Sequence, residues 1–307
     1  MDTHIGAGGW AYFRVPGMDN LEAYSKGFGF VEVNSTYYWY PHPSKARAWR
    51  KAVPDSFSFA VRANRELAEK YEFDVEKAKT SLEKLLALIG ELRAGYVHLL
   101  VPQASAQDPN LPEKLTALFP GGRLGQARVV VEIRPRTSAP APSLLRAIQD
   151  LGAIQCVDLS LEQPEVQGEV LYTRLFGVPE GNTHQFLDEE LERVRTRAEA
   201  GGYQEGVFVF HGVRMYVDTA RFRHLVDTGE HGKATSRIGL ESLGEVLAVD
   251  ATFPTTRDAL LRGQGWKVVD RDETTRVRAE YYLEKLPQGL YGSAGSVMGA
   301  LQKAGIH

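Results

Sequence analysis

Short apolar segments alternate with helix-like segments along most of the chain. In residues 30–40, FVEVNSTYYWY, Val31 and Val33 alternate with Glu32 and Asn34, which is the period of a strand whose two faces differ. An acid and an amide need partners when they are buried, so we expect this strand to deliver them to a cleft beside the rings that follow. Seven other segments have strand character: residues 3–9, 57–64, 95–102, 128–135, 153–159, 170–177 and 206–212.

Helical patterns fill most of the connections between these strands. They cover residues 20–28, 44–52, 75–92, 111–118, 143–151, 187–200 and 215–227. Eight strands alternating with mostly helical connections predict an α/β fold, a (β/α)8 TIM-type barrel, over residues 1–232. A doubly wound open sheet is the alternative, because its strands have the same pattern.

The alternation does not continue into the last quarter of the chain. Residues 233–307 predict a small, mainly helical C-terminal module. Helices are expected at residues 273–286 and 296–303, and Thr255 or Thr256 is expected to cap another one. Acidic and basic residues nearly balance here, so the module gives no charge signal for nucleic acid. Contact with a protein partner is the role we expect for it.

Composition narrows the class of protein. The 307 residues are 43% hydrophobic and 24% charged, as in ordinary globular proteins, and the net charge of -3 gives no global basic field for nucleic acid. The single cysteine, Cys156, excludes an internal disulfide and a cysteine-rich zinc site. No charged leader precedes an apolar core, and no run approaches the length of a membrane span. We therefore expect a cytoplasmic protein without a membrane partner.

The polar residues of the predicted strands fall late in each strand rather than early. In a TIM barrel the C-terminal strand ends meet at one rim, where active sites lie. We therefore expect these residues to converge there, together with nearby glycines and aromatic rings. The set comprises Gly8, Trp10, Tyr12, Glu32, Asn34, Tyr37, Tyr38, Arg62, Asn64, Gln103, Glu132, Arg134, Asp158, Arg174 and His211.

Three carboxylates of this set, Glu32, Glu132 and Asp158, allow two interpretations. In the first, they bind a divalent metal ion (Mg, Mn or Zn) or act as general acid and base. In the second, they neutralise the three arginines of the set, and the equal numbers favour this interpretation. His211 is the one histidine at a predicted rim and is the histidine candidate for acid–base catalysis. His98 is expected to be structural.

The arginines Arg62, Arg134 and Arg174 suit a phosphate or carboxylate ligand, because the guanidinium fork matches its oxygens. Gly8 and its neighbours offer backbone N–H groups, and the aromatic rings offer stacking for a base or a sugar. Together these features indicate a nucleotide or a nucleic-acid strand. The sequence has no H-E-x-x-H pair, no G-x-S-x-G elbow and no Walker loop, so these motifs indicate neither a zinc protease, nor a serine hydrolase, nor an ATPase.

Several motifs resemble the domain-of-unknown-function 72 (YecE-like) family. They are the Gly8–Gly9–Trp10 turn with Tyr12, the V-E-x-N-S-T-x-Y segment at residues 31–38, F-x-F-A at 57–60, V-E-x-R at 131–134 and R-x-x-G at 174–177. The resemblance implies a TIM-type barrel and carries no established activity. Two positions depart from it: Phe176 replaces a frequent histidine, and His211–Gly212 replaces a frequent Asn pair. Residues 253–304 resemble another uncharacterised module, domain-of-unknown-function 2795.

The sequence is compatible with three functions. The first is a hydrolase of a phosphate-containing substrate, a metal-dependent phosphodiesterase or nuclease, with catalytic groups drawn from Glu32, Glu132, Asp158 and His211. The second is a non-catalytic module that binds a nucleotide or sugar phosphate. The third is a glycosidase that uses Glu32 and Glu132 as paired carboxylates. The arginines disfavour the third, because they oppose a protonated acid.

Overall fold

A computed structural model describes residues 1–136, 138–177 and 183–306. The chain divides into two compact units, which are described separately. The first comprises Met1–Leu175 and Arg197–Phe210, and the second comprises Phe176–Thr196 and His211–His307. The domain boundary expected at residue 232 stays a prediction. In the described part of the chain, no helix is both long enough and apolar enough to cross a membrane.

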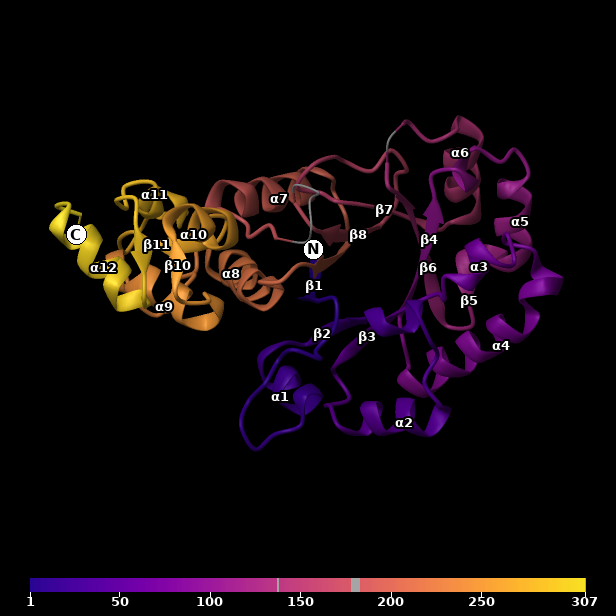
Figure 1. Ribbon diagram of the computed structural model, residues 1–307. Helices are drawn as coiled ribbons and strands as arrows, with labels where there is room; N and C mark the ends of the chain where they lie inside the picture. The colour runs from indigo at the N-terminus through magenta and orange to yellow at the C-terminus, as the bar shows by residue number, and fades with distance from the viewer. Residues whose placement is uncertain (137, 178–182, 307) are drawn as a thin grey trace. The chain divides into compact units, whose positions relative to one another are not determined.

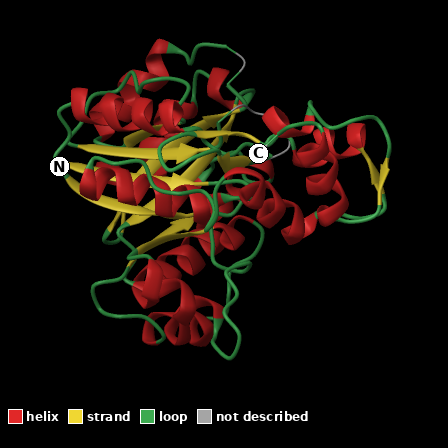
Figure 2. Cartoon of the chain, turned by 90° about the vertical axis from the view of Figure 1, so that its left-hand side faces the viewer, coloured by secondary structure: helices red, strands yellow, loops and turns green. Residues whose placement is uncertain are grey.

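The first unit contains the barrel. Among the described residues, eight parallel strands lie in the order β4-β3-β2-β1-β9-β8-β7-β6, and pairing of β4 with β6 closes the ring. Figure 2 shows these strands side by side with their arrowheads pointing the same way. The predicted TIM-type barrel is thus confirmed, and the open sheet is wrong. The strands are β1 (Asp2–Ala7), β2 (Phe30–Val33), β3 (Ser58–Arg62), β4 (Tyr96–Pro102), β6 (Ala127–Arg134), β7 (Ile154–Val157), β8 (Val170–Leu175) and β9 (Glu205–Phe210).

The barrel strands are largely apolar on both faces because helices cover the outside and side chains fill the inside. Val129, Val130 and Val131 of β6 are all at most 1% exposed. No residue with a side chain fits at Gly6 of β1, since a Cβ atom there would lie 2.1 Å from the backbone oxygen of Phe30 on β2. Close packing of neighbouring strands therefore fixes the positions of their C-terminal ends.

Helices follow most of the strands in sequence. They are α1 (Asn20–Gly27), α2 (Pro43–Lys51), α3 (Glu66–Glu69), α4 (Val75–Leu92), α5 (Leu111–Leu118), α6 (Pro142–Leu151), α7 (Asp188–Ala200) and α8 (Met215–Thr228). Helix α4 begins at Asp74, whose carboxylate accepts from the Lys77 amide, and it ends at Arg93 in a left-handed conformation. Residues 158–169, all of them described, connect β7 to β8 through turns without a helix.

Short elements complete the first unit. The 3₁₀ helix η1 (Asn34–Tyr37) directly follows β2, so Asn34, which was expected in the strand, begins this short helix instead. The others are η2 (Ser105–Gln107), η3 (Pro120–Gly122) and the strand β5 (Arg123–Leu124), which pairs antiparallel with β6.

The C-terminal residues, orange to yellow in Figure 1, contain helices and two small antiparallel pairs. The helices are α9 (Gly239–Asp250), α10 (Arg257–Gln264), α11 (Glu280–Leu283) and α12 (Ala294–Lys303). Strand β10 (Thr255–Thr256) pairs with β13 (Leu290–Tyr291), and β11 (Val268–Asp270) pairs with β12 (Arg276–Arg278). The helix expected over residues 273–286 is wrong, because pairing with β11 draws residues 276–278 into a strand. Thr256 does cap α10, accepting from the Ala259 amide.

Candidate functional site

An arginine inside the barrel joins two glutamates from distant strands. Arg174 of β8 donates through Nε to Glu32 Oε1 at 3.2 Å and through Nη1 to Glu132 Oε2 at 2.5 Å. The Tyr172 hydroxyl donates to the other oxygen of Glu32 at 2.9 Å. The side chains of Arg174 and Glu32 are 2% and 0% exposed, so these bonds form away from water and hold β2, β6 and β8 together.

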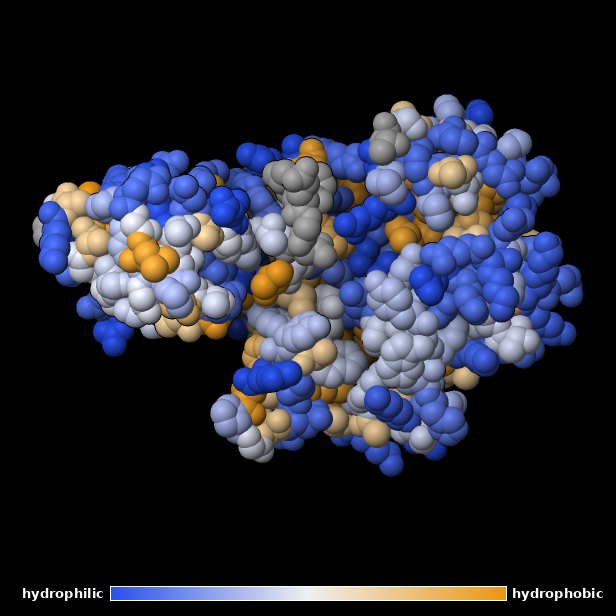
Figure 3. Space-filling view, viewed as in Figure 1, coloured by the Kyte–Doolittle hydropathy of each residue, from blue (hydrophilic) through white to orange (hydrophobic). Residues whose placement is uncertain are grey.

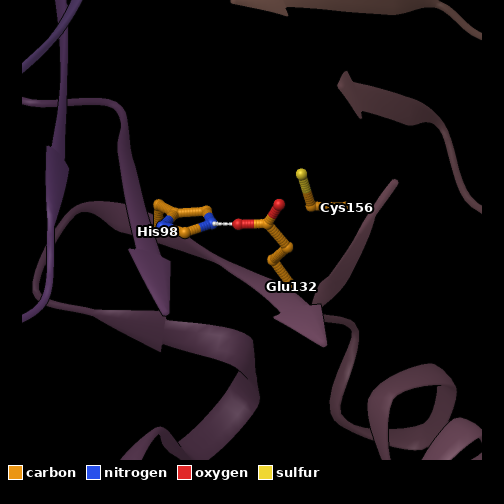
Figure 4. Close-up of side chains that lie close together, drawn as sticks. All are labelled: His98, Glu132 and Cys156. Atoms are coloured by element: carbon orange, nitrogen blue, oxygen red, sulfur yellow. Dashed lines mark hydrogen bonds and ion pairs between the residues drawn. The ribbon is translucent and has the colours of Figure 1, made fainter. Parts of the chain in front are cut away.

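His98 of β4 extends this network, and its neighbours define its tautomer. Arg62 Nε, which can only donate, lies 3.4 Å from His98 Nδ1, so Nδ1 is the acceptor. Nε2 then carries the proton and donates to Glu132 Oε2 at 2.8 Å (Figure 4). Burial, and next the positive charge of Arg174, lowers the pKa of His98 to about 4, so the ring is neutral at pH 7.

Arg62 of β3 connects the network to the aromatic segment. Its Nη1 donates to Asn34 Oδ1 at 2.5 Å, and its guanidinium carbon lies 4.1 Å from the centroid of the Tyr37 ring. Burial, together with the charge of Arg174, lowers the pKa of Arg62 to about 10, which leaves it charged at pH 7. The start of η1 and the end of β3 are thereby held next to the buried carboxylates.

The site has more positive than negative charge. Burial raises the pKa of Glu132, but attraction by Arg174 and the bond from His98 outweigh it and hold that pKa well below its usual value. Arg134 of β6 lies 4.0 Å from Glu132 and keeps 39% of its side chain exposed. Among the described side chains that bond within this network, two carboxylates therefore lie with three guanidinium groups, including Arg62 and Arg174, and the neutral His98 adds no charge.

The site offers few donor atoms to a metal ion. Among the described residues, one group of three potential ligands lies within 4.8 Å: His98, Glu132 and Cys156 (Figure 4). It differs from the expected set, since it contains neither Glu32 nor Asp158. A metal there would compete with a guanidinium for Glu132 Oε2, and burial raises the pKa of the Cys156 thiol well above its usual value. This group fits a divalent ion poorly, and metal binding stays a prediction.

Comparison with known proteins assigns the chain to a family. The family model described as a protein of unknown function, DUF72, matches residues 4–235. The chain belongs to the DUF72 family. The resemblance inferred from the sequence is thus confirmed for this part, whereas the likeness of residues 253–304 to domain-of-unknown-function 2795 stays a prediction. No curated protein matches the chain.

Solved structures of DUF72 proteins share the fold. A DUF72 family protein from Thermotoga maritima MSB8 has 17% identity and a TM-score of 0.58, over 74% of this chain and 100% of its own. One from Enterococcus faecalis V583 has 14% identity and a TM-score of 0.56, over 73% of this chain and 97% of its own. At such identities the likeness shows the fold alone.

Not every predicted site residue of this DUF72 protein joins the network. Asp158 accepts from the amide and the hydroxyl of Ser160, at 3.0 and 2.6 Å, in a local turn after β7. His211 belongs to the second unit, where its ring stacks on Phe176 with centroids 4.4 Å apart. The two positions that depart from the family motifs therefore contact each other. Gln103 donates to Ser138 at 3.0 Å.

The glycine turn and the aromatic candidates lie in the first unit. The Gly8 amide donates to the backbone of Phe210 at 3.0 Å, in line with a structural turn. Trp10 packs edge-on against Trp49, with centroids 5.1 Å apart. Tyr12 is 79% exposed. Their roles in ligand binding stay predictions.

Three residues in or beside the network were not among the sequence candidates: His98 and Tyr172, which bond within it, and Cys156, which lies next to His98 and Glu132. Their signal is the strand register, because His98 pairs with Arg62, and Cys156 pairs with both Glu132 and Tyr172. Residues paired across neighbouring parallel strands point to the same side of the sheet. The sequence does not give that register, since it depends on how the barrel closes.

Proposed function

We propose that this protein binds a phosphate-containing ligand at the C-terminal rim of the barrel. The observation that carries the proposal is the excess of guanidinium groups over carboxylates, with Arg134 half-exposed beside Glu132. A phosphate group can reach the exposed part of Arg134, and the planar guanidinium fork matches its oxygens. The buried bonds among Arg174, Glu32 and Glu132 support this role, because they hold the rim rigid before a ligand arrives.

Calorimetric titration with inorganic phosphate tests the proposal. We expect saturable binding that weakens about tenfold or more in Arg134→Gln, because a charged hydrogen bond is lost. Arg128→Gln is the matched control. Arg128 is the second residue of the strand that Arg134 ends, its side chain is 34% exposed, and it also has an acidic partner, Glu205, at 3.7 Å. Absence of phosphate binding, or equal loss in both variants, would contradict the proposal.

Hydrolysis of a phosphoester is the second candidate function, and one feature of Glu132 favours it. Oε2 of this carboxylate accepts hydrogen bonds from His98 and Arg174. Oε1 lies on the side of the half-exposed Arg134, 4.0 Å from its guanidinium group. An ionised oxygen beside a phosphate-binding arginine is suited to orient a water molecule or to bind a divalent ion. The glycosidase alternative is weaker, because a guanidinium bonded to both glutamates opposes the protonated acid it requires.

A panel of phosphomonoesters and phosphodiesters, each with Mg²⁺, Mn²⁺ or Zn²⁺, tests the hydrolase. We expect turnover that falls about a hundredfold or more in Glu132→Gln. Phosphate binding should survive in that variant, since Arg134 remains. Turnover that is unchanged in Glu132→Gln would exclude Glu132 as the hydrolytic residue.

A further inference from the structure

A groove of about 1000 Å³ lies in the first unit, between the segment that follows η1 and helices α3 and α4. We call it the aromatic groove. Tyr38, Trp39 and Tyr71 contribute rings to its lining, and Tyr38 and Trp39 are 63% and 46% exposed. Asn64 and Ser81 also line it and are buried. In Figure 3, pale side chains of intermediate hydropathy lie beside strongly hydrophilic ones in the region where Figure 1 labels β3 and α3. Much of the remaining lining is polar or charged. A concave site that combines flat rings with polar groups is typical of small-molecule binding.

The groove is held in shape by its own bonds. The backbone N–H of Asn64 donates to the Tyr40 hydroxyl at 2.8 Å, and the side-chain oxygen of Asn64 accepts from the backbone N–H of Glu66 at 3.1 Å. Glu72 and Phe73, which directly follow Tyr71, have φ values of 49° and 59°. Bulky residues rarely adopt this left-handed conformation, and such strain gathers at binding sites. The groove is therefore formed before a ligand arrives.

The charges along the groove largely cancel one another. Arg65 lies 3.6 Å from Glu69, and Lys70 lies 3.6 Å from Glu66. A nucleic-acid strand needs a row of unneutralised cations for its successive phosphates. The aromatic groove lacks that pattern in its described side chains, and it suits an uncharged ring system instead.

The groove adjoins the arginine rim through a chain of ring contacts. The Arg62 guanidinium stacks on Tyr37 at 4.1 Å, and the Tyr37 ring packs against Tyr38 with centroids 5.1 Å apart. Asn64, two residues beyond Arg62, belongs to the groove lining. The lining of the groove is therefore in contact, through Tyr37, with the arginine of β3 that belongs to the rim network.

We propose that the aromatic groove binds the nucleoside portion of a nucleotide whose phosphate group occupies the rim. The base stacks on the exposed rings of Trp39 and Tyr38, and the sugar spans the distance to Arg62. This inference rests on the proposed phosphate site and names the class of its ligand. A single phosphate at the rim and a neutral groove together specify a mononucleotide rather than a strand.

Titrations with four separate probes test the inference: adenosine monophosphate, adenosine, inorganic phosphate and glucose 6-phosphate. We expect adenosine monophosphate to bind at least tenfold more tightly than phosphate or glucose 6-phosphate. Trp39→Ala should weaken the binding of adenosine monophosphate and of adenosine about tenfold and leave the binding of phosphate unchanged. Tyr203→Ala is the control, since Tyr203 precedes β9 and therefore lies at the opposite end of the barrel.

The outcomes separate the two proposals. If phosphate does not bind, the proposed function fails together with the inference that rests on it. If phosphate binds through Arg134 but adenosine monophosphate binds no better, or Trp39→Ala has no effect, only the aromatic groove is refuted. Glucose 6-phosphate that competes as well as adenosine monophosphate would overturn the nucleoside assignment. An oligonucleotide that binds more tightly than the mononucleotide would overturn the choice against a strand.

Discussion

Two buried ion networks, one in each unit, differ in the groups that donate hydrogen bonds to their carboxylates. In the barrel, the bonds among Glu32, Arg174, Glu132 and His98 run from side chain to side chain across separate strands. In the second unit, Asp270 accepts from the backbone amides at residues 234 and 235, at 3.0 and 2.7 Å, as well as from an arginine side chain at 3.0 Å.

The second network continues in the same way. Arg276 joins Asp270 to Asp188, and Arg221 joins Asp188 to the backbone oxygen of Phe186. Carboxylates that bind backbone amides fix the course of loops, which is a structural role. The carboxylates of the barrel network accept from side chains of separate strands, at the end of the barrel where we propose a ligand site. We therefore predict that the barrel network serves the proposed ligand site and that the second network stabilises its own unit.

The largest effect is expected from removing the arginine at the centre of the barrel network. Arg174→Met leaves Glu32 and Glu132 charged and buried, so we expect the free energy of unfolding to fall by roughly 3–5 kcal/mol. Urea denaturation measures it. The triple variant Arg174→Met/Glu32→Gln/Glu132→Gln should recover most of the loss, because no buried charge is left unpaired. A single variant as stable as the natural chain would show that the network contributes little.

Acidification should affect the two networks in opposite directions. The pKa of His98 is about 4 instead of 6.5, so between these values the unfolded chain takes up a proton that the folded chain does not. The free energy of unfolding should therefore decrease as the pH is lowered from 6.5 to about 4, by on the order of 3 kcal/mol. Burial raises the pKa of Asp218 in the second unit from 3.8 to about 6, against the effect of Arg221. There the folded chain takes up the proton first, and stability should rise as pH falls.

Two single variants separate these contributions. His98→Gln should lose less stability than the natural chain between about pH 7 and about pH 4.5, and Asp218→Asn should lose more. Urea midpoints at both pH values give the comparison. Identical pH profiles for both variants and the natural chain would rule out both assignments.

The sequence predicted the barrel well because strand and helix periods are local properties. It also predicted that Glu32, Glu132 and Arg174 would meet, since late positions in parallel strands face one rim. By the same rule the sequence placed Asp158 at this rim. In the structure, however, the Asp158 carboxylate accepts from the nearby Ser160 in a turn. The period of a strand carries no information about such local turns. His98 could not be selected, because its partners depend on the register between strands.

A smaller effect is expected from neutralising Asp270 in the second network. Asp270→Asn keeps the shape but turns an NH₂ group towards either backbone amides or Arg276, so we expect a loss of about 1–3 kcal/mol. Limited proteolysis should locate the loosening in the second unit, and phosphate binding at the barrel should be unchanged. Asp272→Asn, at a half-exposed neighbouring position, should lose less. Weakened phosphate binding in Asp270→Asn would break the division between a functional and a structural network.

The smallest change in stability is expected at the rim. Arg134 and Arg128 lie at opposite ends of β6, with side chains 39% and 34% exposed and carboxylates 4.0 and 3.7 Å away. Half-exposed ion pairs contribute little, so Arg134→Gln and Arg128→Gln should each change the free energy of unfolding by less than about 1 kcal/mol. Urea denaturation and phosphate titration of the same two samples provide the decisive contrast. Equal stability with binding lost only in Arg134→Gln is the signature of a residue retained for a ligand, because a purely structural arginine would lower stability and binding together.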